Sequence, residues 1–233
     1  MSDAAPREHA FLSRSLVRVG ARASDNTIRR LNRCLNYLEA GRWMRRHGYS
    51  LDDPAADRYE LFRRAAREIA DKQVLYIEFG VAHGVSMRFW CDLLRNPLSK
   101  LHGFDSFEGL PTAWSLGGGQ EAGAFSVGGQ VPDLGDPRTK FFKGWFAETL
   151  PHYEFPEHEQ LVVNIDADVY SSAVTVLDAV EAHLRPGSLL YFDEFNHRAD
   201  EMRAFDEFRE RTQMEFELVG ATPQLLAVCF RRV

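Results

Sequence analysis

Four acidic residues directly follow two short apolar runs in the second half of the chain. Asp166 and Asp168 come after the first run, and Asp193 and Glu194 come after the second. Both runs have the length and composition of strands that are buried on both faces. The carboxyl ends of neighbouring parallel strands lie at one edge of a sheet, so we expect the four carboxylates to share one crevice.

Such a group of carboxylates is costly without a cation, because like charges at close range disfavour ionisation. Mg²⁺ would relieve the repulsion, since it takes oxygen ligands and keeps waters that a substrate can replace. The sequence therefore predicts a metal site at this edge of the sheet. The alternative is that one or two of the acids cap helices or pair with arginines.

A glycine-containing turn after an earlier strand is the second pattern with chemical meaning. The apolar run that starts at residue 74 ends in Glu78, and Gly80, Gly84 and a predicted helix follow. A strand that leads through glycines into a helix brings backbone N–H groups and a helix N-terminus close to a ligand. Such junctions also occur in α/β proteins without a ligand site. The Gly-x-Gly-x-x-Gly spacing of a dinucleotide site is missing here.

Asp105 ends the next predicted strand, about 20 residues past the glycine turn, where an acidic side chain can accept hydrogen bonds from ribose hydroxyls. Together with Glu78 it predicts a nucleoside site. The structural alternative for Asp105 is a turn residue or a helix cap.

The positions of apolar residues and chain breakers predict the elements that carry these residues. Helices are predicted over 27–47, 54–70, 86–96, 172–184 and 200–211, and strands over 74–77, 101–104, 139–143, 161–165, 188–192, 215–220 and 225–230. Residues 1–10 are expected to form a loose tail. The alternation of strands and helices predicts an α/β fold with a mostly parallel sheet. The glycine-rich segment 114–137 is expected to border the pocket.

Composition narrows the function classes. The 233 residues are enough for one α/β domain with a sizeable core, 45% of them are hydrophobic, and the net charge is −6. No strongly basic domain stands out, so a nucleic-acid partner is not expected. Three separated cysteines show no metal-ligand spacing, and no apolar stretch has the length of a membrane span. These features favour a cytoplasmic protein without a membrane partner.

The N-terminal part has its own charge pattern and is expected to form a helical extension over residues 1–70, ahead of the main domain over 71–233. Ten arginines stand against four acids before residue 49: Arg7, Arg14, Arg18, Arg22, Arg29, Arg30, Arg33, Arg42, Arg45 and Arg46 against Asp3, Glu8, Asp25 and Glu39. One interpretation is a solvated arginine face on a helix that packs against the domain. The other is a lid or a dimerisation arm, which would make the protein a homodimer.

Five motifs in the same order resemble the class I S-adenosylmethionine-dependent methyltransferases, and in particular the macrocin O-methyltransferase (TylF-like) family. They are Glu78-Phe79-Gly80-Val81, Phe104-Asp105-Ser106-Phe107-Glu108-Gly109-Leu110-Pro111, Gly144-Trp145-Phe146-Ala147-Glu148-Thr149-Leu150-Pro151, Ile165-Asp166-Ala167-Asp168-Val169-Tyr170-Ser171-Ser172 and Phe192-Asp193-Glu194-Phe195. The resemblance extends from about residue 73 to the C-terminus. It implies a Rossmann-like, mostly parallel seven-stranded sheet whose last strand is antiparallel.

The resemblance also implies which residues bind the cofactor S-adenosylmethionine (SAM) and Mg²⁺. The cofactor set is Glu78, Gly80, Val81, His83, Gly84, Ser86, Asp105, Ser106, Phe107, Gly144, Trp145, Phe146 and Asp166. Within it, Glu78 and the glycines contact the methionine part, Asp105 the ribose, and Gly144 to Phe146 the adenine edge. The metal set is Asp166, Asp193 and Glu194. Glu194 stands where the characterised sugar O-methyltransferases carry a second Asp.

The expected activity is Mg²⁺-assisted methyl transfer to a hydroxyl of a sugar, polyol or phenol in a secondary metabolite or glycan. A metal held by Asp166 would bind the acceptor hydroxyl and lower the pKa of that hydroxyl. Asp168 or His197 would then take the proton. Two alternatives remain at this point. A metal-dependent hydrolase could use the same carboxylates, and a protein of this fold could bind SAM without catalysing any transfer.

Overall fold

The computed structural model describes residues 5–114 and 119–233 and contains a seven-stranded sheet in the order β3-β2-β1-β4-β5-β7-β6. The strands are β1 (Val74–Phe79), β2 (Lys100–Asp105), β3 (Thr139–Lys143), β4 (Gln160–Ile165), β5 (Leu189–Phe192), β6 (Phe216–Ala221) and β7 (Val228–Arg232). Strands β3, β2, β1, β4 and β5 are parallel to one another, whereas β7 is antiparallel to both β5 and β6. All seven predicted strands are present, and the prediction of an antiparallel last strand is confirmed.

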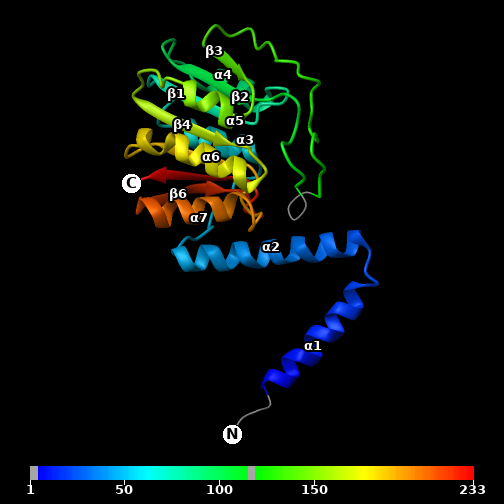
Figure 1. Cartoon of the computed structure of the whole chain (residues 1–233). Helices are drawn as coiled ribbons and strands as arrows, with labels where there is room; N and C mark the ends of the chain where they lie inside the picture. The colour runs from blue at the N-terminus through cyan, green and yellow to red at the C-terminus, as the bar shows by residue number, and fades with distance from the viewer. Residues whose placement is uncertain (1–4, 115–118) are drawn as a thin grey trace.

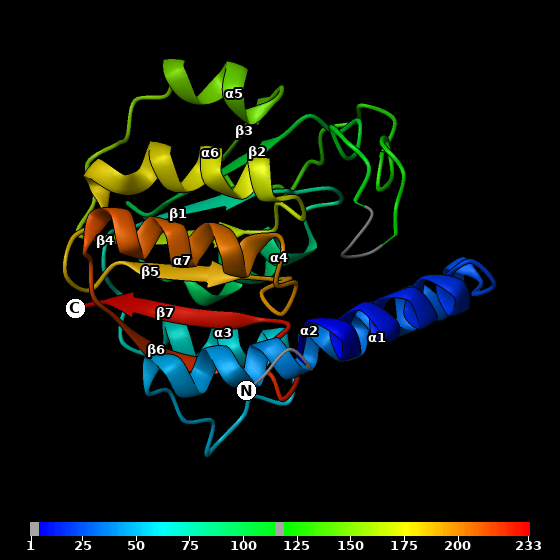
Figure 2. The same ribbon diagram turned by 60° about the horizontal axis from the view of Figure 1, so that its bottom comes forward.

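Helices cover both faces of this sheet (Figures 1 and 2). They are α1 (Ala5–Gly20), α2 (Asp25–His47), α3 (Arg58–Ala66), α4 (Val85–Leu93), α5 (Phe146–Thr149), α6 (Tyr170–Val180) and α7 (Glu201–Thr212), with short 3₁₀ turns at Leu150–His152 and Glu181–His183. Helices α6 and α7 share one hydrophobic cluster with the C-terminal half of α2, and α3 and α4 share a second cluster on the opposite face. This is the three-layer arrangement expected for a parallel sheet.

Alternation along β1 assigns its side chains to the two layers. Leu75, Ile77 and Phe79 belong to the cluster beneath α6 and α7, whereas Val74 and Tyr76 belong to the cluster beneath α3 and α4. All six residues of β1 are buried. A continuous apolar run is therefore read correctly as a strand with both faces covered.

The predicted helix over 54–70 is shorter in the structure. Helix α3 starts at Arg58 because Asp57 is its N-cap, and the Asp57 side chain accepts a hydrogen bond from the backbone N–H of Glu60. Leu61 and Phe62 of this helix are fully buried. Helix α3 therefore packs closely against the sheet.

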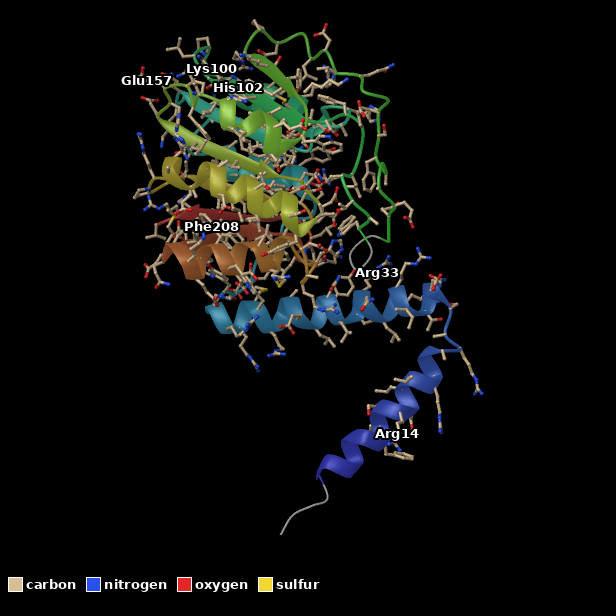
Figure 3. The ribbon with its side chains drawn as sticks, in the orientation of Figure 1. Arg14, Arg33, Lys100, His102, Glu157 and Phe208 are labelled. Atoms are coloured by element: carbon tan, nitrogen blue, oxygen red, sulfur yellow. The ribbon has the colours of Figure 1, made fainter. Side chains whose placement is uncertain are left out.

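The N-terminal helices leave the body of the protein at one end (Figure 1). Helix α2 ends at His47, as predicted, and Gly48, with a φ of 68°, is its C-cap. Near that end Trp43 is buried, and its ring lies 4.9 Å from that of Phe195. Helix α1 points away from the sheet, as the position of Arg14 in Figure 3 shows.

The loose tail predicted over residues 1–10 is wrong from residue 5 onward, where α1 begins, and residues 1–4 lie outside the described residues. Several large apolar side chains of α1 and α2 are exposed to solvent: Phe11, Leu12, Leu16, Val17, Val19, Ile28, Leu31, Leu35 and Leu38. The division of the chain at residue 70 stays a prediction.

No helix within the described ranges is both long and apolar enough to span a membrane.

Candidate functional site

A cleft of about 520 Å³ lies at the carboxyl ends of β1, β2, β4 and β5. Its lining contains nine of the residues predicted for the site: Gly80, Asp105, Ser106, Trp145, Phe146, Asp166, Asp168, Asp193 and Glu194. Eleven further residues complete it: Arg58, Ala82, Gly109, Leu110, Pro111, Phe125, Ala147, Ala167, Ser171, Ser172 and Thr175. Phe125 comes from the glycine-rich segment that was expected to border the pocket.

The other predicted site residues are not part of the lining. They are Glu78, Val81, His83, Gly84, Ser86, Phe107, Gly144 and His197, all of which lie within four positions of a lining residue in the sequence. The opposite edge of the sheet carries a different set of residues. Lys100, His102 and Glu157 lie there, at the amino-terminal ends of the strands (Figure 3).

Gly80 explains how the first turn reaches the end of β4. Its φ is +92°, and a Cβ atom at this position would lie 1.9 Å from the backbone oxygen of Asp166. Only glycine combines this backbone conformation with so close an approach. The turn after β1 therefore lies directly against the residue that begins the acidic segment after β4.

Asp105 holds the same turn from the other side. Its Oδ2 accepts hydrogen bonds from the backbone N–H groups of Val81, at 2.8 Å, and Ala82, at 2.7 Å. Its Oδ1 accepts one from the N–H of Phe107, at 2.6 Å. Asp105 is thus a turn residue, the structural alternative considered from the sequence, and it also lines the cleft.

Glu78 does not line the cleft. It shares a face of the strand with Tyr76, whose hydroxyl donates a hydrogen bond to it. Asn164 in turn donates to the oxygen of Tyr76, at 3.0 Å. Burial raises the pKa of Glu78 to about 8. The sequence placed this carboxylate correctly at the strand end, but its side chain belongs to a buried network.

The predicted acidic residues do converge at the cleft. Burial, followed by the charge of Asp193, raises the pKa of Asp166 well above its usual range. The same two causes raise the pKa of Asp168 to about 7 and that of Glu194 to about 8. These shifts reflect the repulsion expected from the sequence, together with the cost of burying charge.

A cation of the chain itself already contacts this group. Arg58, the first residue of α3, forms an ion pair with Oδ2 of Asp193, a side chain that is almost fully buried. The hydroxyl of Tyr191 donates to the other oxygen of Asp193, at 3.2 Å. Both carboxylate oxygens of Asp193 therefore have partners. Pairing with an arginine was the alternative to a metal, but nothing in the sequence pointed to Arg58 as the partner.

The predicted metal set does not fit a bound ion as it is arranged. Across residues 5–114 and 119–233, no three His, Cys, Asp or Glu side chains form a group that could hold a metal ion. Asp193 would have to leave Arg58 before it could act as a ligand.

Of the two residues considered as the base, Asp168 is better placed than His197. Asp168 lines the cleft and has a φ of +59°, a conformation that is strained for a residue with a side chain. A pKa of about 7 suits a proton acceptor at neutral pH. His197 does not line the cleft. Its Nδ1 lies 3.5 Å from Oε2 of Glu194. Burial lowers the pKa of His197 to about 4.

Glu201 is a buried residue that the sequence analysis missed. Its Oε1 accepts a hydrogen bond from the N–H of Ala167, at 3.2 Å, and its Oε2 accepts one from the N–H of Glu194, at 3.1 Å. It therefore ties together the two segments that carry the acidic cluster. An acid in the first turn of a helix usually indicates capping, so the sequence contained no signal for this role.

We expect Glu201→Gln to lower the free energy of unfolding by roughly 1–3 kcal/mol, because an amide offers one acceptor oxygen and leaves one buried N–H without a partner. Urea denaturation measures the change. Glu210→Gln, at an exposed position of the same helix, is the control. Equal stability of the two variants would show that Glu201 does not tie these segments together.

Comparison with known proteins agrees with this geometry. Residues 128–232, somewhat less than half of the chain, match the family model described as Macrocin-O-methyltransferase (TylF). The third, fourth and fifth motifs lie inside this segment, and the first two precede it. No curated protein gives a significant match to the sequence.

Solved structures share the fold. The calicheamicin methyltransferase CalS11 is 23% identical with a TM-score of 0.60, and the alignment covers 76% of this chain and 80% of that one. The O-methyltransferase NovP is 20% identical with a TM-score of 0.58, over 90% of this chain and 100% of that one. At these identities the likeness establishes the class I methyltransferase fold.

Taken together, the structural likeness shows that the chain has the class I methyltransferase fold, and the family model matches its C-terminal part. Within that class the chain resembles the macrocin O-methyltransferases, as its motifs predict.

Proposed function

We propose that this protein transfers the methyl group of SAM to a hydroxyl of a sugar, polyol or phenol that belongs to a secondary metabolite or a glycan. One observation carries the proposal: the residues suited to a nucleoside and the candidate base Asp168 line the same cleft. Its volume of about 520 Å³ is typical of small-molecule sites, which span roughly 300–1,000 Å³.

The lining has the chemistry that SAM requires. Asp105 supplies a carboxylate for ribose hydroxyls, and Trp145 and Phe146 supply aromatic surface for the adenine. The methionine part would lie near Gly80, which lines the cleft. The acidic residues of the cleft suit the positive charge of a sulfonium.

When bound, SAM supplies an electrophilic methyl group on its sulfonium, and the residues of the cleft prepare the acceptor oxygen that takes it. Asp168 accepts the hydroxyl proton as the oxygen forms its bond to the methyl carbon and the bond between that carbon and the sulfonium sulfur breaks. The cleft also holds the acceptor in line with the methyl group, an effect worth roughly 7–11 kcal/mol of the barrier when positioning is good.

The proposed reaction does not include the Mg²⁺ assistance that was expected from the sequence. Neither carboxylate oxygen of Asp193 is without a partner, because one pairs with Arg58 and the other accepts a hydrogen bond from Tyr191. The cytoplasmic location also stays a prediction. So does a homodimer through the N-terminal helices, which the molar mass in solution would check.

We expect saturating SAM to raise the midpoint of thermal unfolding by roughly 5–10 °C, because a ligand at 100 times its dissociation constant adds about 2.7 kcal/mol. NAD serves as the control and should give no shift. Transfer of labelled methyl groups to a panel of sugars and phenols then tests for turnover. A shift without transfer to any acceptor would indicate a SAM-binding protein, and no shift would return the hydrolase to consideration.

A further inference from the structure

Arg58 enters the cleft from outside the part of the chain that carries the motifs. It is the first residue of α3, which precedes β1. Its side chain is 35% exposed, forms an ion pair with Asp193 and lines the cleft. A second guanidinium nitrogen lies 3.5 Å from the hydroxyl of Ser86. Two elements, α3 and the start of α4, thus hold this side chain at the carboxyl edge of the sheet.

The charged side chains around Arg58 are acidic. Among the described residues that line the cleft, Arg58 is the sole basic side chain, whereas five are acidic: Asp105, Asp166, Asp168, Asp193 and Glu194. The charges of Asp193 and Asp166 both favour the charged form of Arg58. A guanidinium stays protonated throughout the physiological pH range, so this positive charge is permanent.

We propose that Arg58 is the built-in cation of this carboxylate cluster and excludes a divalent ion from it. Asp193 accepts hydrogen bonds on both oxygens, from Arg58 and Tyr191, so an ion at this carboxylate would compete with both donors and lie close to the positive charge of Arg58. An ion that displaced Arg58 would leave a guanidinium without its buried partner, which is costly. The cluster therefore already contains one fixed positive charge, paired with Asp193, without a metal.

A second consequence concerns the reaction and rests on the proposed methyl transfer. A guanidinium carries five N–H donors, and Asp193 takes only part of them. Because Arg58 lines the cleft, its remaining donors can hydrogen-bond the acceptor oxygen while Asp168 takes the proton. Arg58 would then supply the positive charge that a metal supplies in other sites.

Ion binding tests the exclusion without any need for turnover. We expect Arg58→Met to bind Mn²⁺, followed by its electron paramagnetic resonance signal, at least about tenfold more tightly than the unaltered chain, because one nearby positive charge is lost. Arg63→Met removes one charge from an exposed position of the same helix, where Arg63 lies over the ring of Phe89. This control and Arg58→Lys should both bind Mn²⁺ as weakly as the unaltered chain does.

Two results would overturn the exclusion. One is equal Mn²⁺ affinity in Arg58→Met and the unaltered chain. The other is a gain in affinity that persists when Asp193→Asn is added to Arg58→Met. The unaltered chain is informative by itself if Arg58→Met fails to fold, since tight Mn²⁺ binding that Asp193→Asn abolishes would equally contradict the proposal.

Turnover tests the catalytic consequence separately. We expect the methylation rate of the unaltered chain to be the same in EDTA and in Mg²⁺, and Arg58→Met to lose at least about tenfold in kcat, as expected for removal of a charged donor. Arg58→Lys should recover part of that loss. A strict requirement for Mg²⁺ would overturn this consequence. A chain without methyl transfer would refute the proposed function but leave the ion-binding result interpretable.

Discussion

Asp168→Asn is expected to lower the rate of methyl transfer by about 10²–10⁴-fold, the usual contribution of a general base. The amide is close to the carboxylate in size but cannot accept the hydroxyl proton. SAM affinity should change little, because Asp105, Trp145 and Phe146 supply the proposed contacts to the nucleoside. The measurement is kcat with the best acceptor, beside the SAM dissociation constant of each variant.

The pH profile gives this prediction a second readout. Burial raises the pKa of Asp168 to about 7, so the fraction of deprotonated base increases as the pH rises through that value. The rate of the unaltered chain should rise accordingly between about pH 6 and 8 and then level off. The rising limb should be absent in Asp168→Asn.

His197→Asn is the matched control at the other candidate base. Burial lowers the pKa of His197 to about 4, and the residue is not part of the lining, so a smaller loss of rate is expected. A larger loss in His197→Asn than in Asp168→Asn would assign the base to His197. The loss of SAM binding in Asp168→Asn would instead show that Asp168 serves the cofactor.

Asp105→Ala is expected to weaken SAM binding by more than about tenfold and to destabilise the protein by roughly 1–3 kcal/mol. The change removes the acceptor of three backbone N–H groups, those of Val81, Ala82 and Phe107. The turn after β1 would then lose its fixed shape at the point where it faces the cofactor. Calorimetric titration with SAM and the thermal midpoint, which should fall by roughly 2–12 °C, measure the two effects.

Two further variants separate these effects. Asp105→Asn keeps one acceptor oxygen, so it should fall between the alanine variant and the unaltered chain in both measurements. Asp133→Ala removes a carboxylate that accepts a hydrogen bond from Gly135 in an exposed turn, and should leave SAM affinity unchanged. Undiminished SAM binding in Asp105→Ala would contradict the nucleoside site proposed for this cleft.

The order of elements could be predicted from the sequence because each depends on local chemistry. Apolar runs that lie between breakers, such as 161–165, become buried strands. Helix α2 begins within two residues of the predicted start, because the Ser24 side chain caps it by accepting the N–H of Thr27. Predicted ends were less accurate where a different residue caps the helix, as Asp57 does for α3.

The direction of a side chain at a strand end was harder to predict. Glu78 and Asp105 end neighbouring strands, and both were expected at the ligand. One faces a buried network with Tyr76, and the other lines the cleft. Alternation gives opposite faces to successive residues of a strand, but which face a ligand uses depends on the helices that cover the sheet.

The sequence by itself determined the α/β fold, the acidic strand ends and the resemblance to the macrocin O-methyltransferases, because these follow from residue types at short spacing. The tertiary structure alone decided which charges meet. Arg58 precedes its partner Asp193 by well over a hundred residues, and Glu201 bonds to two segments at once. Such contacts depend on how whole helices pack against the sheet, and no local pattern of residues specifies them.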